Sequence, residues 1–319
     1  MPPMPVRNDA LEQALAAIDK YDPAVQPRTI ELYRDILAAV DATGVRKIGD
    51  AAYGPHERHR MDIYLPETPP ARALPMLLYF HQGGFIAGDK NQGGDLFFSN
   101  IGKFFARNGV IASLVNFRLP PDGMWPAGAA DTGAALDWMR ERATELGGDP
   151  RRIYLAGHSS GATHIADYVL KGSTPAERRA DCAGLILLSG RFRLPPARAD
   201  FTDINNFGRP KIEAYYGADP STWRDREVPG HIVSDPCPVY VLVAEFDHFA
   251  FEVNALDIAI ELARKSGAMP RFRQVRGHNH LSQVLQIGTP HDTLGPDLLA
   301  FINAPSTPPR WRGLVGDFR

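Results

Sequence analysis

The sequence predicts an α/β fold in which helices cover both faces of a mostly parallel sheet. From about residue 60 onward, short apolar segments typical of strands alternate with longer segments whose apolar residues recur at helical spacing. The run Val-Tyr-Val-Leu-Val at residues 239–243 is apolar throughout, as expected for a central strand that is covered on both sides. Strands that alternate with helices of this length are joined by crossovers and therefore form a parallel sheet.

The expected elements follow one another in a regular order. Residues 9–43 contain two helical segments, because apolar residues recur every three or four positions and Pro23 and Pro27 interrupt the pattern. Residues 61–65 alternate as a strand with one polar face, which ends at Pro66. The segments that follow alternate between the two types, and we expect strands at 76–81, 110–116, 152–156, 184–189, 239–244 and 271–276, and helices at 97–108, 128–146, 160–171, 250–266 and 296–303.

Three departures from this order define the expected domain organisation. Residues 1–55 form an N-terminal helical segment, and residues 56–305 form the α/β domain. Residues 191–237 interrupt that domain, and we expect them to lie over the carboxyl edge of the sheet, where ligands bind in open α/β folds. Together with the N-terminal helices they are expected to form a small lid. Residues 306–319 form a C-terminal tail, and its docking on a second subunit, as in a homodimer, stays open.

Composition excludes several classes of protein. The chain has 319 residues, a hydrophobic content of 44% and a formal net charge of −2, so neither nucleic acid nor an anionic membrane is expected as a partner. No segment reaches the roughly 18 apolar residues that span a bilayer, and residues 1–5 lack the pattern of a signal peptide. Cys182 and Cys237 are expected to be buried free thiols, which favours a reducing compartment and a cytoplasmic protein.

The most informative motif is Gly-His-Ser-Ser-Gly at residues 157–161. It lies between the expected strand 152–156 and the expected helix 160–171, which is the context of a nucleophile elbow. Such a turn lifts the serine hydroxyl, here that of Ser159, above the sheet. A second motif, His-Gln-Gly-Gly-Phe at residues 81–85, also follows an apolar strand, and its glycines leave backbone N–H groups free to face an oxyanion. The two motifs together favour a serine hydrolase.

A nucleophilic serine needs a general base and an acid that orients the base. Glu245 and Asp247 follow one late strand, and His278 and His280 follow the next, so both loops emerge at the same edge of the sheet as Ser159. Asp247 is favoured over Glu245 because it lies farther into its loop. His280 is favoured over His278 because it directly precedes an expected helix start, whereas His278 is expected to make a hydrogen bond that stabilises the loop.

Four of these segments resemble the motif set of the α/β-hydrolase superfamily: residues 81–85, 157–161, 245–247 and 277–280. The resemblance extends over roughly residues 58–304 and is strongest to the hormone-sensitive-lipase-like esterases, with the kynurenine formamidase-like proteins and carboxylesterases. It implies an α/β-hydrolase fold and a carboxylesterase that works through an acyl-enzyme, without a metal or an organic cofactor.

The resemblance also implies a role for each site residue. Ser159 attacks the carbonyl, His280 takes and later returns its proton, and Asp247 stabilises the imidazolium. The backbone N–H groups expected to form the oxyanion hole are those of Gly83, Gly84 and Ser160. Gln82 stands where the family has the first glycine of His-Gly-Gly-Gly, a difference that bears on the shape of the pocket.

The expected substrate is a small carboxylic ester with an apolar or aromatic group, because aromatic residues gather near the expected mouth of the site. The substrate-binding candidates are Phe85, Trp125, Phe207 and His248. Phe201 and Phe249 belong to the same aromatic set, and core or lid packing is an equal expectation for each aromatic residue. His158, inside the elbow, is expected to be packed or to face solvent.

Functions other than an esterase either stay open or are disfavoured by the sequence. An arylformamidase or another amide hydrolase has the same triad and stays open, as does a non-catalytic receptor or binding protein of this fold, although such proteins usually lack a triad residue. A zinc hydrolase is disfavoured because His-Glu-Arg-His at residues 56–59 has the wrong spacing and precedes a strand. Dinucleotide binding is disfavoured because the glycines at residues 83–88 do not match G-x-G-x-x-G.

Overall fold

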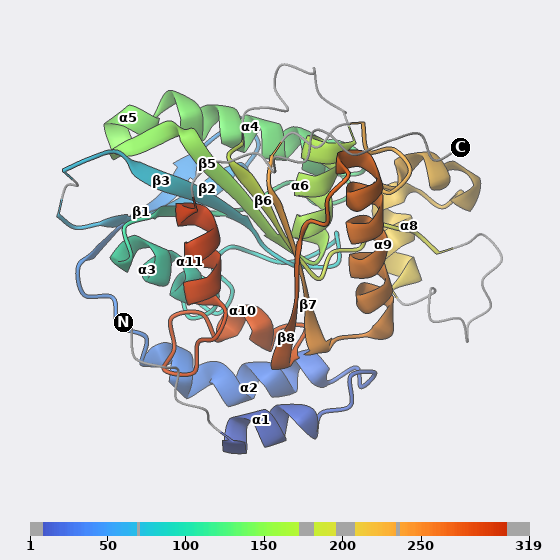
Figure 1. Ribbon diagram of the computed structural model, residues 1–319, viewed down its shortest axis with the longest axis horizontal. Helices are drawn as coiled ribbons and strands as arrows, with labels where there is room; N and C mark the ends of the chain where they lie inside the picture. The colour runs from blue at the N-terminus through green and yellow to red at the C-terminus, as the bar shows by residue number, and fades with distance from the viewer. Residues whose placement is uncertain (1–8, 69–70, 172–181, 196–207, 234–236, 305–319) are drawn as a thin grey trace.

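The computed structural model describes residues 9–68, 71–171, 182–195, 208–233 and 237–304. These residues form one eight-stranded sheet with helices on both faces (Figure 1). The expected α/β class is therefore confirmed.

The sheet is mostly parallel, with strand order β1-β2-β4-β3-β5-β6-β7-β8. β2 pairs antiparallel with both β1 and β4, and every other pair of neighbours is parallel. All the expected strands are present within a few residues of their expected bounds. The strands are β1 (Val45–Ala52), β2 (Arg60–Pro66), β3 (Leu74–Phe80), β4 (Ile111–Val115), β5 (Gly148–His158), β6 (Gly184–Leu188), β7 (Val239–Phe246) and β8 (Arg271–Asn279).

β1 is the strand that the sequence analysis missed. It lies at the edge of the sheet and is largely exposed, so it has no apolar run. Its register shifts between Ile48 and Ala51, and Asp50 there has a φ of 52°, so the polar–apolar alternation of a strand is broken. The expected helical segment 1–55 therefore ends at Ala38, and the sheet begins at Val45 rather than after residue 56.

The expected helices are also present, although the one expected at 128–146 is divided into two at Arg142. Helix α8 and two short 3₁₀ helices, Pro220–Thr222 and Arg224–Arg226, lie in the segment 191–237, for which no element was expected. The helices are α1 (Asp9–Ala16), α2 (Val25–Ala38), α3 (Ser99–Arg107), α4 (Ala127–Glu141), α5 (Ala143–Leu146), α6 (Ser160–Leu170), α8 (Arg209–Tyr216), α9 (Phe249–Ser266), α10 (Ser282–Leu285) and α11 (Gly295–Asn303).

Two apolar layers lie on the two faces of the sheet. In β3, the side chains of Met76, Leu78 and Phe80 belong to one layer, and those of Leu77 and Tyr79 belong to the other. This follows from the geometry of a strand, in which successive side chains point to opposite faces. Helices α4, α6 and α9 pack on the first layer, and α3 and α11 pack on the second. The central strands are apolar on both faces because helices cover both faces of the sheet.

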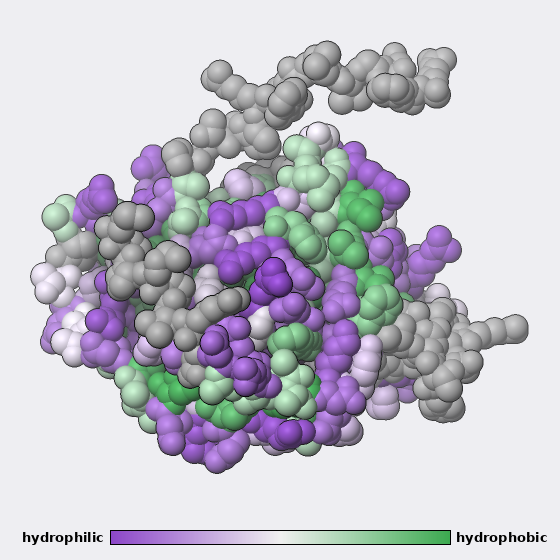
Figure 2. All heavy atoms as spheres, turned by 60° about the horizontal axis from the view of Figure 1, so that its bottom comes forward, coloured by the Kyte–Doolittle hydropathy of each residue, from purple (hydrophilic) through white to green (hydrophobic). Residues whose placement is uncertain are grey.

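Helices α1 and α2 pack on the second layer near the end of β8 (Figure 1). Leu15, Tyr33 and Leu37 are buried there, and Asn279 at the end of β8 donates a hydrogen bond of 2.7 Å to Thr29 of α2. The N-terminal helices are therefore fixed to the domain by apolar burial and by a buried polar contact. Figure 2 brings this side of the molecule forward and shows hydrophilic and apolar side chains interspersed on it.

Cys182 and Cys237 are buried free thiols, as expected. They precede β6 and β7, and their sulfur atoms lie 3.4 Å apart. None of the helices in the described residues is both long enough and apolar enough to cross a bilayer.

Candidate active site

The nucleophile elbow forms where β5 ends and α6 begins. Ser159 stands between them with φ 56° and ψ −120°, a strained conformation for a residue with a side chain, which costs about 1–3 kcal/mol. Its backbone N–H donates a hydrogen bond of 2.8 Å to the carbonyl oxygen of Leu188 at the end of β6. The neighbouring strand β6 thus holds the turn in place. The strained residue is the serine whose hydroxyl a nucleophile elbow lifts above the sheet.

The loop after β3 lies directly against this elbow. A Cβ atom placed on Gly161 would lie 2.2 Å from the carbonyl oxygen of Phe80, so the first turn of α6 touches the end of β3. Gly84, four residues beyond Phe80, has a φ of +59°, which favours glycine. Ser160 is the first residue of α6, so its N–H has no acceptor within the helix. The loop after β3 and the first turn of α6 are therefore in contact beside Ser159.

His280 and Asp247 form a hydrogen-bonded pair at the same edge of the sheet. The His280 Nδ1–H donates to the Asp247 Oδ1 over 2.8 Å, and the same carboxylate oxygen accepts the backbone N–H of His248 at 3.0 Å. Asp247 is fully buried, whereas His280 is partly exposed. The carboxylate thereby fixes the orientation and tautomer of the ring and leaves Nε2 of His280 to act as a base.

The two rejected candidates make other contacts. The Glu245 carboxylate accepts the backbone N–H of Gly277 at 2.7 Å, which ties the end of β7 to β8. His278 is hydrogen-bonded through Nδ1 to the Ser282 hydroxyl at 3.2 Å, and burial lowers its pKa to about 4. The expected loop-stabilising contact of His278 is thus present.

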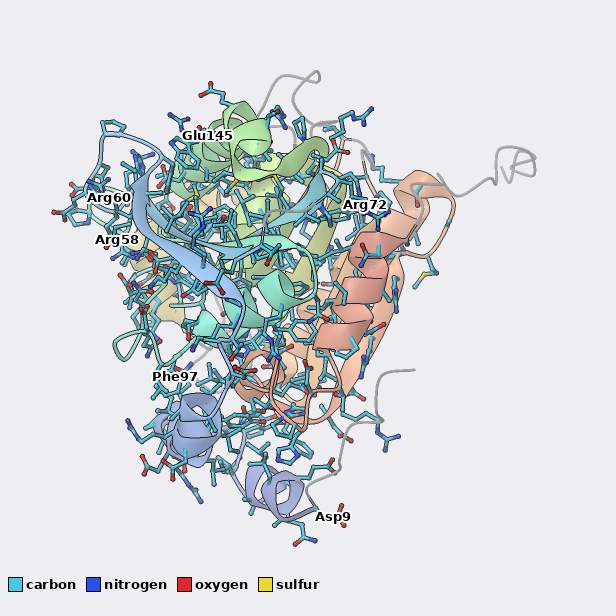
Figure 3. All side chains as sticks on the ribbon, turned by 90° about the vertical axis from the view of Figure 1, so that its left-hand side faces the viewer. Asp9, Arg58, Arg60, Arg72, Phe97 and Glu145 are labelled. Carbon is cyan, nitrogen blue, oxygen red and sulfur yellow. The ribbon has the colours of Figure 1, made fainter. Side chains whose placement is uncertain are left out.

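One cavity of about 320 Å³ unites the candidate residues. The members of the predicted site that line it are Ser159, His280, Asp247, Gly83 and Gly84, with Gln82 beside them. A larger cavity, of about 730 Å³, lies at the other end of the sheet. Arg72 and Glu145, which line that larger cavity, lie at the top of Figure 3, far from Asp9 at the start of α1. Among the described residues, this larger cavity and the cavity lined by Ser159 have no lining residue in common, so the two are separate.

The ring of His280 packs against two other rings. Phe251 stacks on it with ring centres 4.3 Å apart, and His158 lies on it with ring centres 4.7 Å apart. Burial lowers the pKa of His158 well below its usual value, and the charge of His280 adds to this effect. His158 is therefore neutral beside the base and confines its ring. His158 was expected to be packed or to face solvent, and it is packed. Its contact with His280 joins residues 122 positions apart, so it has no local signal in the sequence.

The four substrate-binding candidates have different positions. Phe85 and His248 line the cavity, and burial, followed by the charge of Arg191, lowers the pKa of His248 to about 4. Trp125 is not among the described lining residues, because its indole N–H donates to Asp167 at 2.9 Å in a neighbouring aromatic cluster. Phe207 lies outside the described residues, as does Phe201, while Phe249 is exposed.

Three cationic side chains that the sequence analysis did not assign to the site also line the cavity: Lys20, Arg191 and Lys211. Arg191 lies three residues after the end of the strand β6, so its place at the carboxyl edge was a signal that could have identified it. Lys20 and Lys211 reach the cavity only because the N-terminal segment and the segment 191–237 fold over it.

The His-Glu-Arg-His segment does not resemble a metal site. Residues 56–59 lie in the loop between β1 and β2, and the His59 Nε2 lies 3.1 Å from an Asp131 oxygen. Throughout the part of the chain that the structure describes, no group of three or more His, Cys, Asp or Glu side chains is arranged to hold a metal ion.

Known sequences that are similar to this chain include proteins named as esterases. Residues 61–182 match the family model described as BD-FAE. A rice (Oryza sativa subsp. japonica) protein named probable isoprenylcysteine alpha-carbonyl methylesterase is 24% identical over 268 residues, which cover 79% of this chain and 63% of that protein. Esterase LipI of Mycobacterium tuberculosis is 37% identical over 105 residues, which cover 33% of this chain and 32% of that protein. The matches thus span less than two thirds of these relatives.

Solved structures of esterases superpose on nearly the whole of this chain and so identify its fold. An esterase from the archaeon Pyrobaculum calidifontis superposes with a TM-score of 0.67 at 19% identity, covering 94% of this chain and 97% of that one. Esterase B from Lactobacillus rhamnosis superposes with a TM-score of 0.66 at 16% identity, covering 92% and 97%. The chain has the α/β-hydrolase fold, and its sequence is similar to those of carboxylesterases.

Proposed function

We propose that this protein is a serine hydrolase of the carboxylesterase type, which cleaves small carboxylic esters through an acyl-enzyme. The observation that carries the proposal is the shared cavity, which Ser159 lines together with the hydrogen-bonded pair of His280 and Asp247 and the glycines of the loop after β3. The similarity to proteins named as esterases supports the same activity.

The proposed reaction has two steps. The Ser159 hydroxyl attacks the ester carbonyl while Nε2 of His280 takes its proton, and the imidazolium then protonates the departing alcohol as the acyl-enzyme forms. Water, deprotonated by His280, attacks the acyl-enzyme, and Ser159 leaves with its proton restored. Asp247 stabilises the imidazolium in both steps. The backbone N–H groups of Gly83, Gly84 and Ser160 bind the oxyanion, and each such donor is worth about 3 kcal/mol in the transition state.

The cavity also supports the proposed lid. Val25 and Gln26 from the N-terminal segment line it together with Ile212 from the segment 191–237. A substrate on Ser159 is therefore covered by two segments outside the core of the sheet. Among the described residues that line the cavity, no contact favours an amide over an ester, and the relatives described above are named as esterases. The cytoplasmic location and a homodimer stay predictions from the sequence.

The test uses a short-chain 4-nitrophenyl ester and a fluorophosphonate probe. We expect wild-type protein to hydrolyse the ester and to carry the probe on Ser159, as located by peptide mass spectrometry. Ser159→Ala should abolish both without changing the unfolding temperature, whereas Ser221→Ala, in the exposed 3₁₀ helix Pro220–Thr222, should change neither. A folded wild-type protein that neither hydrolyses esters nor takes up the probe would instead indicate the non-catalytic binding protein.

A further inference from the structure

Gln82 is a buried polar side chain at the site to which the proposed reaction gives no role. It lies two residues after the end of β3 and directly before Gly83 and Gly84, which are the expected oxyanion donors. It lines the same cavity as Ser159, and only 6% of its surface is exposed. Because it stands in place of the first glycine of the motif described above, its side chain is a feature of this chain that the general mechanism does not explain.

The backbone around Gln82 is held without help from its side chain. Residue 82 does not lie in the left-handed region, whereas Gly84 does, with a φ of +59°. The Gln82 carbonyl oxygen accepts the Nδ1–H of His81 at 2.6 Å. A Cβ atom placed on Gly88 would lie 2.2 Å from the same oxygen, so the turn is closely packed on that side. The position thus accepts a side chain, and the side chain has no task in shaping the turn.

The amide of Gln82 makes no hydrogen bond to any described residue. Neither of its polar atoms is one of the fully buried atoms that lack a partner, so both are still reached by solvent. A primary amide offers two N–H donors and one acceptor oxygen, and leaving them unpaired in a nearly enclosed place costs free energy. Gln26 and Gln92 also line the cavity, but both are more exposed, so water satisfies their amides.

The order of the strands places Gln82 and His280 on opposite sides of Ser159. β3 is one neighbour of β5, and β8 is the third strand beyond β5 in the other direction. In the proposed reaction His280 protonates the departing alcohol, so the alcohol lies on the side of β8. This leaves the side of the loop after β3 for the acyl group, and Phe85 of that loop lines the cavity as well.

We propose that the Gln82 amide faces the cavity and binds a hydroxyl on the acyl group, so that the preferred substrate is an ester of a short hydroxy acid. The inference rests on the proposed esterase activity and names its substrate class. A hydroxyl donates and accepts, as the amide does, so one such group pairs with it. The ring of Phe85 suits the apolar remainder of a short acyl chain. The proposal thus adds one polar group to the apolar substrate expected from the sequence.

The experiment compares two esters of nearly the same shape. Ethyl 3-hydroxybutanoate carries the hydroxyl, and ethyl 3-methylbutanoate has a methyl group in its place. Hydrolysis is followed by chromatography of the acid product. Each kcat/KM is divided by the rate constant for hydrolysis of the same ester by hydroxide, which removes the difference in intrinsic reactivity. We expect the corrected wild-type value to be higher for the hydroxy ester, because the methyl analogue leaves the amide unpaired.

The variants remove the amide and keep the rest of the site. Gln82→Met preserves the length of the side chain, and we expect it to lower the ratio of the two corrected kcat/KM values by about 10-fold. Gln82→Gly introduces the glycine of the related motif and should lower the ratio in the same way, so the test does not depend on one variant folding. Gln274→Met is the matched control, since Gln274 is an exposed glutamine of β8 outside the described lining of the cavity, and the ratio should not change. Unfolding temperatures show whether each variant is folded.

The outcomes separate the substrate class from the activity. Equal corrected values for the two esters in the wild type overturn the hydroxyl proposal and leave the esterase intact, as does hydrolysis of the 4-nitrophenyl ester without hydrolysis of the hydroxy ester. A ratio that folded Gln82→Met and Gln82→Gly leave unchanged also overturns it. If both esters then lose activity equally, the amide instead serves the oxyanion.

Absence of hydrolysis of every ester would overturn the esterase itself. Calorimetric titration of the wild-type protein with ethyl 3-hydroxybutanoate then decides the Gln82 site separately. Binding that is tighter than that of ethyl 3-methylbutanoate and is weakened by Gln82→Met supports the site. Absence of binding, or binding that Gln82→Met does not change, ends it.

Discussion

Substituting alanine at Gly161 tests whether the contact between the elbow and the loop after β3 positions the reacting groups. A Cβ atom there would lie 2.2 Å from the Phe80 carbonyl oxygen, where ordinary contacts begin near 3.4 Å. The first turn of α6 and the end of β3 must therefore separate by about 1 Å. A displacement of that size between catalytic groups costs about 100-fold in rate, so we expect Gly161→Ala to lower kcat/KM by about two orders of magnitude.

The sign of the stability change makes this test specific. Alanine replacing glycine within a helix normally stabilises it by about 0.5–1 kcal/mol, so helix propensity alone would raise the unfolding temperature of Gly161→Ala. The backbone clash predicts a decrease instead. Gly49→Ala is the control, because a Cβ there meets no atom closer than 4.0 Å. Activity on a short-chain 4-nitrophenyl ester and thermal unfolding are measured for both. A Gly161→Ala protein with wild-type activity and stability would refute the reasoning.

Three further predictions concern the buried ionisable groups. Asp247→Asn should lower kcat about 10,000-fold, because the amide can donate to Nδ1 and so favour the wrong tautomer of His280, and because it has no charge to stabilise the imidazolium. Glu245→Gln should leave kcat within tenfold, and the reverse order would show that the acid is Glu245. His280→Ala should lose several orders of magnitude in kcat, and His278→Ala should lose stability instead, so equal losses of kcat would contradict the assignment of the base. Burial raises the pKa of Asp167 to about 6, so the folded state holds this proton more tightly than the unfolded chain and wild-type stability falls as the pH rises from 3.8 through about 6. Asp167→Asn should reduce the difference in the free energy of unfolding between pH 4 and pH 8 by up to about 3 kcal/mol, as measured by denaturant unfolding. If the variant shows the same difference as the wild type, the prediction is wrong.

The sequence predicted those parts of the fold that depend on local patterns. Apolar runs such as 239–243 identify central strands wherever they occur, because both faces of a covered strand must be apolar. Edge strand β1 has one exposed face and a register shift, so its residues carry no such pattern. The same reasoning explains α8, a short helix in the segment 191–237 whose surroundings, rather than its own periodicity, keep it folded.

The candidate site was predictable to the extent that topology fixes it. Parallel strands end at one edge of the sheet, so a serine, an acid and a histidine that follow three such strands must lie near one another. Between Asp247 and Glu245, position in the loop favoured the residue that the structure places against His280. Trp125 was a candidate on its aromatic character alone, and the structure places it in a neighbouring cluster instead.

By itself, the sequence determined the order of strands and helices, the tight turn at Ser159 and the glycines beside it, because each depends on the steric demands of adjacent residues. Only the tertiary structure decided what surrounds the reacting groups. The rings that confine His280 and the cations of Arg191 and Lys211 come from segments far apart in the chain. Their convergence depends on how the layers pack, and this information is spread over the whole core rather than held in any one motif.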